Sequence, residues 1–400
     1  MRTAGVQRAL IATVQVLALA VWFSVSAVVP SVQQDLVISS SSAVWLTASV
    51  QLGFVAGAVT SAALNLADRV PVHLLLGTSA ALAAAVTSLL ALVAAGLPEM
   101  VGLRFLTGLF LAGVYPTGMK LMASWAPATR RGLSMGLLIG ALTLGSALPN
   151  LVGGLAALEW RSVLHVTAAV GGLGSLLAFV LVRPGPHLSR SKSPLDPGYA
   201  LRMFTRRRPL LINLGYFGHM WELYALWTWI PVFVLHASAD FGGYSQVMVF
   251  ATMGVVGFAG CLLGGWAADR FGRRRAAVTA LTVSGACCLL SPLAFDAAAP
   301  LLAVFCAVWG ASVIADSGVF STALSESVDP QHVGTALTAQ TAVGFALTVA
   351  SIQIVPLLAE ATQWRYALLV LAAGPILGVL AMGRLEARGT PERTTTSGTA

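Results

Sequence analysis

Only a few ionisable side chains of this 400-residue chain lie inside its long apolar runs, and they are the first candidates for chemistry. They are Arg104, His219, Glu222 and Asp316, together with His165, for which we favour a packing role. A charge in an apolar interior is costly, so each one needs a reason. Such groups either exchange protons, pair with a charged ligand, or pair with one another.

The residues around Glu222 form the densest group. At 100° per residue, Trp229 lies about 20° and His219 about 60° from Glu222 on a helical wheel. These three share one helix face, whereas Tyr224 and Trp227 point elsewhere. Glu222 either carries a proton, pairs with a cationic substrate, or forms a structural pair with another helix. We favour the first two over the third.

Two further charges leave the choice open. Asp316 lies in a run rich in small residues, where a functional and a structural role fit equally. Arg104 lies toward the outer end of its run, where it either snorkels, caps a helix or acts on substrate or protons. For Arg104 we favour function.

The composition identifies the elements that must position these groups. Apolar residues make up 57% of the chain and charged residues 10%, against about 25% charged residues in soluble domains. The chain is therefore expected to be an all-α integral membrane protein. Its four cysteines lie in apolar runs without a C-x-x-C pattern, so we expect no disulfide, metal or cofactor. The net charge of +8 comes from basic loops, so we expect no nucleic-acid partner.

Twelve runs have the length of a membrane-spanning helix. They are 9–29, 44–64, 72–93, 99–121, 132–154, 162–182, 209–235, 245–266, 276–295, 299–322, 333–357 and 365–384. With the N-terminus inside, 20 of the 23 basic residues fall on the cytoplasmic side. We therefore predict a multi-pass protein of the plasma membrane with both termini in the cytoplasm.

The longest stretch between runs divides them six and six. It is a linker, 183–208, with a short surface helix expected around Tyr199–Arg207. We expect an N-terminal half at 1–182, a C-terminal half at 209–385 and a disordered tail at 386–400.

The two halves repeat one another at an offset slightly above 200 residues. Ala67-Asp68-Arg69 recurs as Ala268-Asp269-Arg270, and Trp160-Arg161 recurs as Trp364-Arg365. The second copy extends into a longer motif made of Gly265, Asp269, Arg270, Gly272, Arg273 and Arg274.

With this motif, G-x-x-x-D-R-x-G-R-R, the chain resembles the major facilitator superfamily over its whole length. Arg104 and Gly108 are similar to that family's R-x-x-x-G element, and Gly145 and Pro149 approximate its antiporter motif. The resemblance implies twelve helices in two six-helix halves of inverted three-helix repeats, with substrate bound between the halves during alternating access. It also implies that Asp269 belongs to a cytoplasmic latch, rather than to a simple topology anchor.

Small residues recur every four positions in two runs, at Gly132, Gly136 and Gly140 and again from Gly334. Such rows let helices approach closely. We expect both rows to be packing or sliding surfaces.

The leading hypothesis is a secondary active transporter of a small molecule, coupled to protons and acting as a monomer. Two substrates remain open: uptake of a small anion, as in cyanate- and nitrate-type permeases, or efflux of an amphipathic cation. A transport-inactive membrane sensor is the alternative from another class. We expect no enzyme, because no constellation of catalytic groups is present.

Overall fold

The computed structural model describes residues 3–64, 66–126, 131–156, 159–188, 196–237, 239–329 and 332–385, and every regular element in these ranges is helical. The first part of the chain forms α1 (Ala4–Leu19), α2 (Val29–Leu36), α3 (Ser40–Ala63), α4 (Leu66–Arg69), α5 (Val72–Val93), α6 (Leu97–Leu111), α7 (Tyr115–Trp125), α8 (Arg131–Ala156) and α9 (Trp160–Val180).

The second part is built in the same way. It consists of α11 (Arg207–Ala237), α12 (Ser245–Val249), the π-helix η4 (Phe250–Val256), α13 (Gly257–Phe271), α14 (Arg273–Ala294), α15 (Ala299–Ala315), α16 (Ser317–Ser325), α17 (Val333–Thr362), α18 (Trp364–Ala367), η6 (Leu368–Ala372) and α19 (Ala373–Gly383).

Ten helical stretches in the described ranges are long and apolar enough to cross a membrane. They coincide with ten of the twelve expected spans. The span expected at 9–29 is not among these ten, because helix α1 ends at Leu19 and the chain is irregular up to Val25, so this part forms a shorter apolar helix. The span expected at 209–235 forms the 31-residue helix α11, whose polar and aromatic residues keep its hydropathy low.

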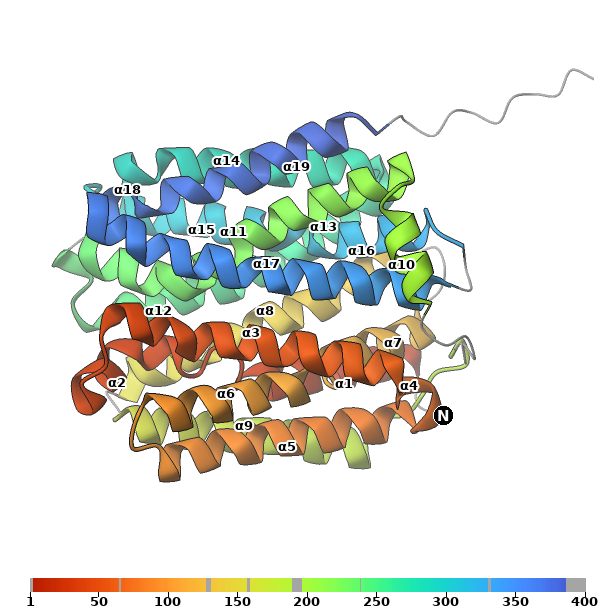
Figure 1. Cartoon of the computed structure of the whole chain (residues 1–400), viewed down its shortest axis with the longest axis horizontal. Coiled ribbons are helices and arrows are strands. Elements are labelled where there is room, and N and C mark those ends of the chain that lie inside the picture. Colours follow the sequence, from red (N-terminus) through yellow and green to blue (C-terminus); the bar gives the residue numbers. More distant parts are fainter. Residues whose placement is uncertain are drawn as a thin grey trace, which may run out of the picture.

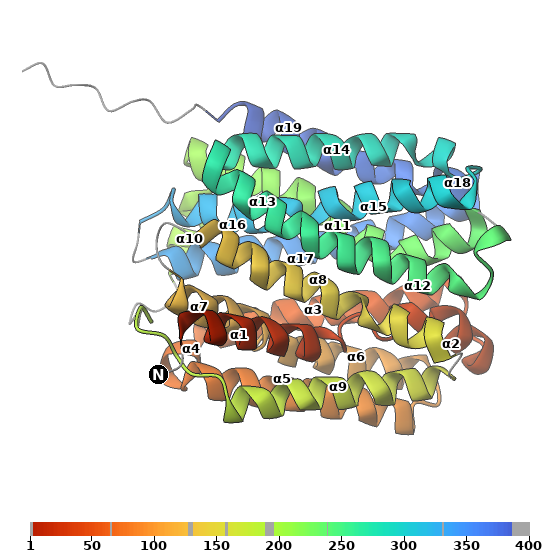
Figure 2. The same ribbon diagram turned by 180° about the vertical axis from the view of Figure 1, so that it is seen from behind.

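The helices form two groups that lie side by side. Helices α1–α9 occupy one group and α11–α19 the other (Figures 1 and 2). The groups meet where α8 packs on α13 and where α3 packs on α17. Any site between these helices is therefore built from both parts of the chain.

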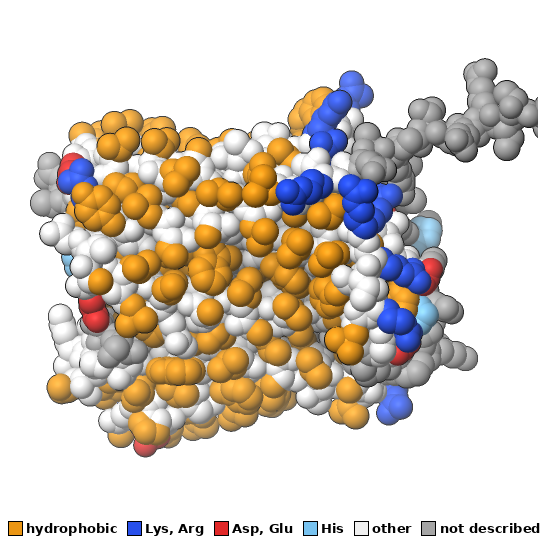
Figure 3. All heavy atoms as spheres, turned by 45° about the horizontal axis from the view of Figure 1, so that its top comes forward, with side chains coloured by type: hydrophobic (Ala, Val, Ile, Leu, Met, Phe, Trp, Pro, Cys, Tyr) orange, Lys and Arg blue, Asp and Glu red, His pale blue; other side chains and the backbone are white. Residues whose placement is uncertain are grey.

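The two ends of the molecule differ in charge. Lysine and arginine side chains gather at one end, next to α10 (Figure 3). We call this the basic end and the opposite one the far end. At the far end, Arg365 pairs with Asp296 at 2.6 Å and Arg161 approaches Asp35 at 3.9 Å.

Within the linker, the structure shows a short helix α10 (Pro197–Met203), slightly earlier than the expected one. The backbone N–H of Tyr199 donates to Asp196 Oδ1 at 3.1 Å and holds the pKa of Asp196 below its usual value. The Tyr199 ring stacks on His332, with centroids 4.0 Å apart. These contacts attach α10 to the second helix group. The tail 386–400 lies outside the described residues.

Candidate functional site

The centre of the molecule holds an aromatic cluster formed by both helix groups. Its members are Trp22, Phe23 and Phe54 from the first group, and Tyr224, Trp227 and Phe345 from the second. The Phe54 and Phe345 rings lie 4.4 Å apart, and Trp22 lies 5.6 Å from Phe345. All six side chains are buried. Trp22 and Phe23 reach the centre from the irregular stretch that follows α1.

Glu222 lies inside the second helix group rather than in the aromatic cluster. Its Oε1 accepts a hydrogen bond from Trp309 Nε1 at 2.7 Å and one from Cys288 Sγ at 3.3 Å. Its side chain is 1% exposed. The carboxyl group is thus enclosed between α11, α14 and α15.

His219 lies one turn of α11 away from Glu222 and meets a second acid. Its Nδ1 lies 2.8 Å from Asp316 Oδ1, at the break between α15 and α16, and both side chains are 1% exposed. This contact has the length of an ion pair but not the geometry of a hydrogen bond, since Asp316 Oδ1 has no hydrogen-bond partner among the described residues. His219 Nε2 also makes no hydrogen bond within the described part of the chain. The α11 face with two ionisable groups therefore meets an α15–α16 segment with Trp309 and Asp316.

Trp229 does not join this group. Its Nε1 donates to the Ile352 carbonyl at 2.8 Å and its ring lies 5.6 Å from Trp364. On a helical wheel Trp229 and Glu222 point in nearly the same direction. Trp229 nevertheless lies two turns further along α11, where the neighbouring helix is α17. Tyr224 and Trp227, also on α11, instead contact Phe23 of the first helix group, with ring centroids 5.9 Å and 5.5 Å away.

Arg104, on α6, is fully buried and holds the irregular stretch after α1. It donates to the carbonyls of Val21 (3.0 Å), Leu46 (3.2 Å) and Trp22, and to Ser24 Oγ (3.4 Å). In the described part of the chain no carboxylate lies within ion-pair distance of Arg104. Its charge is therefore solvated by neutral groups alone.

At the basic end, Asp269 joins the two helix groups. Its Oδ2 accepts from the backbone N–H of Leu133, in the first turn of α8, at 3.0 Å, and its Oδ1 accepts from Arg273 at 2.8 Å. A carboxylate at a helix N-terminus is stabilised by the free N–H groups and the helix dipole. Arg273 also approaches Glu326 at 3.4 Å. We call these contacts the basic-end latch.

Other motif residues shape the turn that follows. Gly272 has φ +92°, a conformation that other residues rarely adopt, and joins α13 to α14. Arg274 donates to the Gly383 carbonyl at 2.7 Å. Arg270 is exposed and makes no hydrogen bond or ion pair with a described residue. Pro149 and Gly145 lie inside α8, and a Cβ on Gly145 would meet the Val16 carbonyl of α1.

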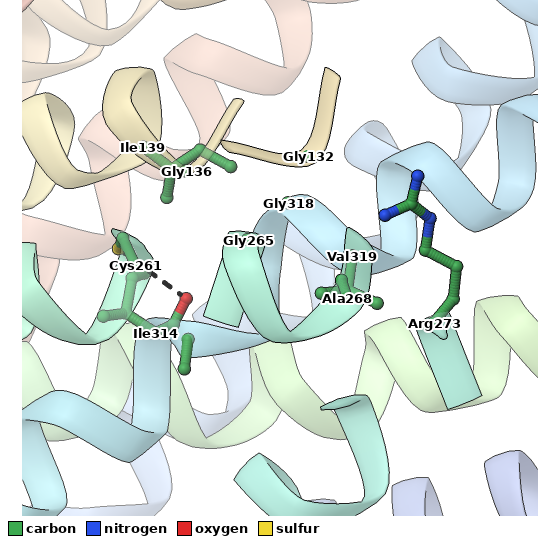
Figure 4. A pocket seen from close by; sticks show the side chains of 11 residues that line it. Gly132, Gly136, Ile139, Cys261, Gly265, Ala268, Arg273, Ile314, Gly318 and Val319 are labelled. Carbon is green, nitrogen blue, oxygen red and sulfur yellow. Dashed lines mark hydrogen bonds between the residues drawn. The ribbon is translucent and has the colours of Figure 1, made fainter. Parts of the chain in front are cut away.

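The glycine row of α8 packs on α13 beside the latch. A Cβ at Gly136 would lie 2.5 Å from the Cys261 carbonyl, and one at Gly132 would meet the Asp269 carboxylate. A Cβ at Gly265 would lie 2.6 Å from the Gly132 carbonyl, and one at Gly140 would lie 2.7 Å from the Phe258 ring. Figure 4 shows Gly132 and Gly136 facing this part of α13. Gly334, by contrast, has no described atom within 4 Å of its Cβ position, so it does not pack against the described part of the chain.

This difference between glycines gives a prediction. Gly136→Ala is expected to destabilise the protein by about 1–3 kcal/mol, because the added methyl group meets a backbone carbonyl that cannot move aside. Gly334→Ala, the matched control, is expected to be neutral or slightly stabilising. Thermal unfolding in detergent, followed by tryptophan fluorescence, measures both. Equal unfolding temperatures would contradict the packing role of Gly136.

The far end is closed by Gln246 at the start of α12. Its Nε2 donates to the Ala27 carbonyl at 3.1 Å, and its side chain lies against Gly153 and Gly154 of α8. Contacts between the helix groups therefore exist at both ends, and the centre between them is filled by the aromatic cluster. The structure is an occluded conformation.

Comparison with known proteins identifies the family of this chain. The profile of the Major Facilitator Superfamily matches residues 11–352 and 262–399. The chain belongs to this superfamily. Its fold is accordingly that of the superfamily, with two six-helix halves of inverted three-helix repeats, and the family is one of membrane transporters, not enzymes.

Individual superfamily members are more distant. A D-galactonate transporter of Escherichia coli O6:H1 is 29% identical over 211 residues, 45% of this chain and 48% of that protein. A probable sulfoacetate transporter of Cupriavidus necator is 28% identical over 225 residues, 50% of this chain and 51% of that protein. The chain thus spans about half the length of the curated relatives it matches. The solved proton:xylose symporter XylE is 15% identical, with a TM-score of 0.74 over 94% of both chains.

Trp309, Cys288 and the first-half residues of the aromatic cluster are not among the candidates that the sequence predicts. A signal for Trp309 was present, because it precedes Asp316 by seven residues and so lies on the same face of one helix. No signal marked Trp22 and Phe23, since nothing in the residues predicts that the first span is interrupted.

Proposed function

We propose that this superfamily member is a proton-coupled transporter of small organic anions, working by alternating access between the occluded state and states open at either end. The basic end faces the cytoplasm in this proposal, following the distribution of arginine and lysine. The observation that carries the proposal is Arg104, a fully buried cation beside the aromatic cluster that no described carboxylate neutralises.

The charge of Arg104 supports an anionic substrate over a cationic one. Arg104 donates to the Trp22 carbonyl, so its charge lies within a few ångströms of the cluster where the halves meet. In a low-dielectric interior such a charge attracts an anion and repels a lipophilic cation. The acids Glu222 and Asp316 do not offset it there, since they lie within the second half against Trp309 and His219.

The two relatives named above support the same class. The transporters of D-galactonate and, probably, of sulfoacetate both carry organic acids. Neither alignment extends far beyond half of the chain, so the substrate of this protein is our inference.

For the proton we propose the group formed by Glu222 and His219 of α11 and by Asp316 at the break between α15 and α16. Each of these side chains is able to bind and release a proton, and all are 1% exposed, so a bound proton is shielded from water in the occluded state. The two groups on α11 are one turn apart, and α11 also carries Tyr224 and Trp227 of the central cluster. Movement of this helix would change both sites together.

The test replaces Glu222 with glutamine, which keeps an oxygen to accept from Trp309 and Cys288 but carries no titratable proton. In proteoliposomes with a trapped pH dye, an inward gradient of pooled organic acids is expected to acidify the lumen with the wild type. Glu222→Gln is expected to reduce this proton flux by about 100-fold or more, the lower end of the usual contribution of a proton-transfer group.

The matched control is Glu99→Gln, an exposed acid at the start of α6, which is expected to leave the flux unchanged. Proton flux with lipophilic cations instead of acids would exclude the anion assignment. Flux that survives in Glu222→Gln would move the coupling to His219 and Asp316. Binding of acids without any flux would identify the protein as a sensor.

A further inference from the structure

A small cavity lies between the halves on the far-end side of the aromatic cluster. It is lined by Phe23, Ser146, Asn150, Trp227, Pro231 and Met253, among others. In the occluded state its free space accommodates about one or two water molecules. Gln246, which bonds the carbonyl of the lining residue Ala27, lies between it and the far end. Opening of that end would widen the cavity and expose it.

Three polar side chains in this cavity lack partners. Ser146 Oγ, Asn150 Oδ1 and Trp227 Nε1 make no hydrogen bond to any described residue, although the three residues are only 2%, 7% and 8% exposed. Buried polar groups are nearly always paired, and each unpaired one costs about 1–3 kcal/mol. Three such groups in one cavity point to a ligand that supplies the missing partners.

The chemistry of the three groups restricts the ligand. Trp227 Nε1 only donates, Asn150 Oδ1 only accepts, and Ser146 Oγ does both. Among the described residues, those that line the cavity include no charged side chain. A carboxylate only accepts, so it would leave Asn150 Oδ1 unpaired as it is placed here. A hydroxyl group both donates and accepts, so neighbouring hydroxyls satisfy all three groups.

We propose that this cavity binds the hydroxyl-bearing part of the substrate, so that the transported anions are polyhydroxy acids of the sugar-acid class. This inference rests on the proposed function for the anionic group. Arg104 donates to the carbonyls of Val21 and Trp22 and to the Ser24 hydroxyl. Phe23, which lies between these residues in the chain, belongs to the cavity wall. The carboxylate is thus attracted toward the Arg104 side of this stretch while the hydroxyls enter the cavity.

The test measures uptake of D-galactonate, which carries hydroxyls, and of sulfoacetate, which carries none, by purified protein in proteoliposomes. The variants are Asn150→Leu and Ser146→Ala, which remove cavity groups with little change of size. Ser134→Ala is the matched control: this serine lies on the same helix, is 2% exposed and also lacks a partner, but lies about three turns away near the basic end.

The wild type is expected to prefer D-galactonate. Asn150→Leu and Ser146→Ala are each expected to raise the KM for D-galactonate about 5- to 10-fold, the effect of one net hydrogen bond. The KM for sulfoacetate is expected to stay unchanged. Ser134→Ala is expected to alter neither KM. Equal KM values of the wild type for both acids, or variants that raise both equally, would overturn the hydroxyl site and leave organic-anion transport standing. Failure of the wild type to move any organic acid would overturn both proposals.

Discussion

Arg104→Met is expected to reduce organic-acid uptake about 100-fold. The substitution removes the hydrogen bonds from Arg104 to the carbonyls of Val21, Trp22 and Leu46, although Val21 keeps the Ser24 hydroxyl as a donor at 2.9 Å. At about 1 kcal/mol for each lost hydrogen bond, the irregular stretch loses roughly 3 kcal/mol of preference for its present conformation. The same change removes the charge that attracts the anion. Initial rates of uptake into proteoliposomes provide the measurement.

Two further variants separate the causes. Arg104→Lys keeps the positive charge, but a single ammonium group cannot reach both the carbonyls at residues 21–22 and the carbonyl of Leu46. Uptake by this variant is therefore expected to be about a tenth of the wild-type rate. Arg161→Met is the matched control, since Arg161 also donates to two carbonyls, of Ala91 and Ala94, but its side chain is 36% exposed and water replaces it. Wild-type uptake by Arg104→Met would reduce Arg104 to a packing residue.

Asp269→Ala is expected to open the basic end. The loss of the carboxylate leaves the N–H of Leu133 without this acceptor and leaves Arg273 with Glu326 alone, and the lost contacts are worth about 1–2 kcal/mol at a helix N-terminus. This corresponds to a shift of roughly 5- to 30-fold toward conformations open at that end. Uptake is expected to fall because the closed state is then rarely reached.

Cys261 reports this opening without an added label site. It is 2% exposed in the groove between α8 and α13, 3.9 Å from the Ile314 carbonyl. Its rate of alkylation by a maleimide, followed by mass spectrometry of its peptide, is expected to rise at least 5-fold in Asp269→Ala. The cysteines at 287, 288 and 306 are internal controls, and Arg270→Ala is the control variant. An unchanged rate at Cys261 would show that Asp269 does not hold this end closed.

Much of the architecture was determined by the sequence alone. Apolar runs of about 20 residues, separated by short basic loops, permit only membrane-spanning helices, because backbone groups in a bilayer must bond within one helix. The motif that ends at Arg274 marked the family through fixed glycines and an acid. Glu222, His219 and Asp316 were visible because a charge among apolar residues stands out.

Only the tertiary structure decided how these residues are grouped. A helical wheel gives the direction of a side chain but not the neighbour at its depth, so Glu222 and Trp229 share a direction and meet different helices. The interruption at residues 20–25 has no local sequence cause, because its carbonyls are satisfied by Arg104, about 80 residues away along the chain. The central cluster and the cavity beside it exist only where two halves meet. Contacts between segments so distant in sequence depend on how the helices pack, and a local sequence pattern does not predict that packing.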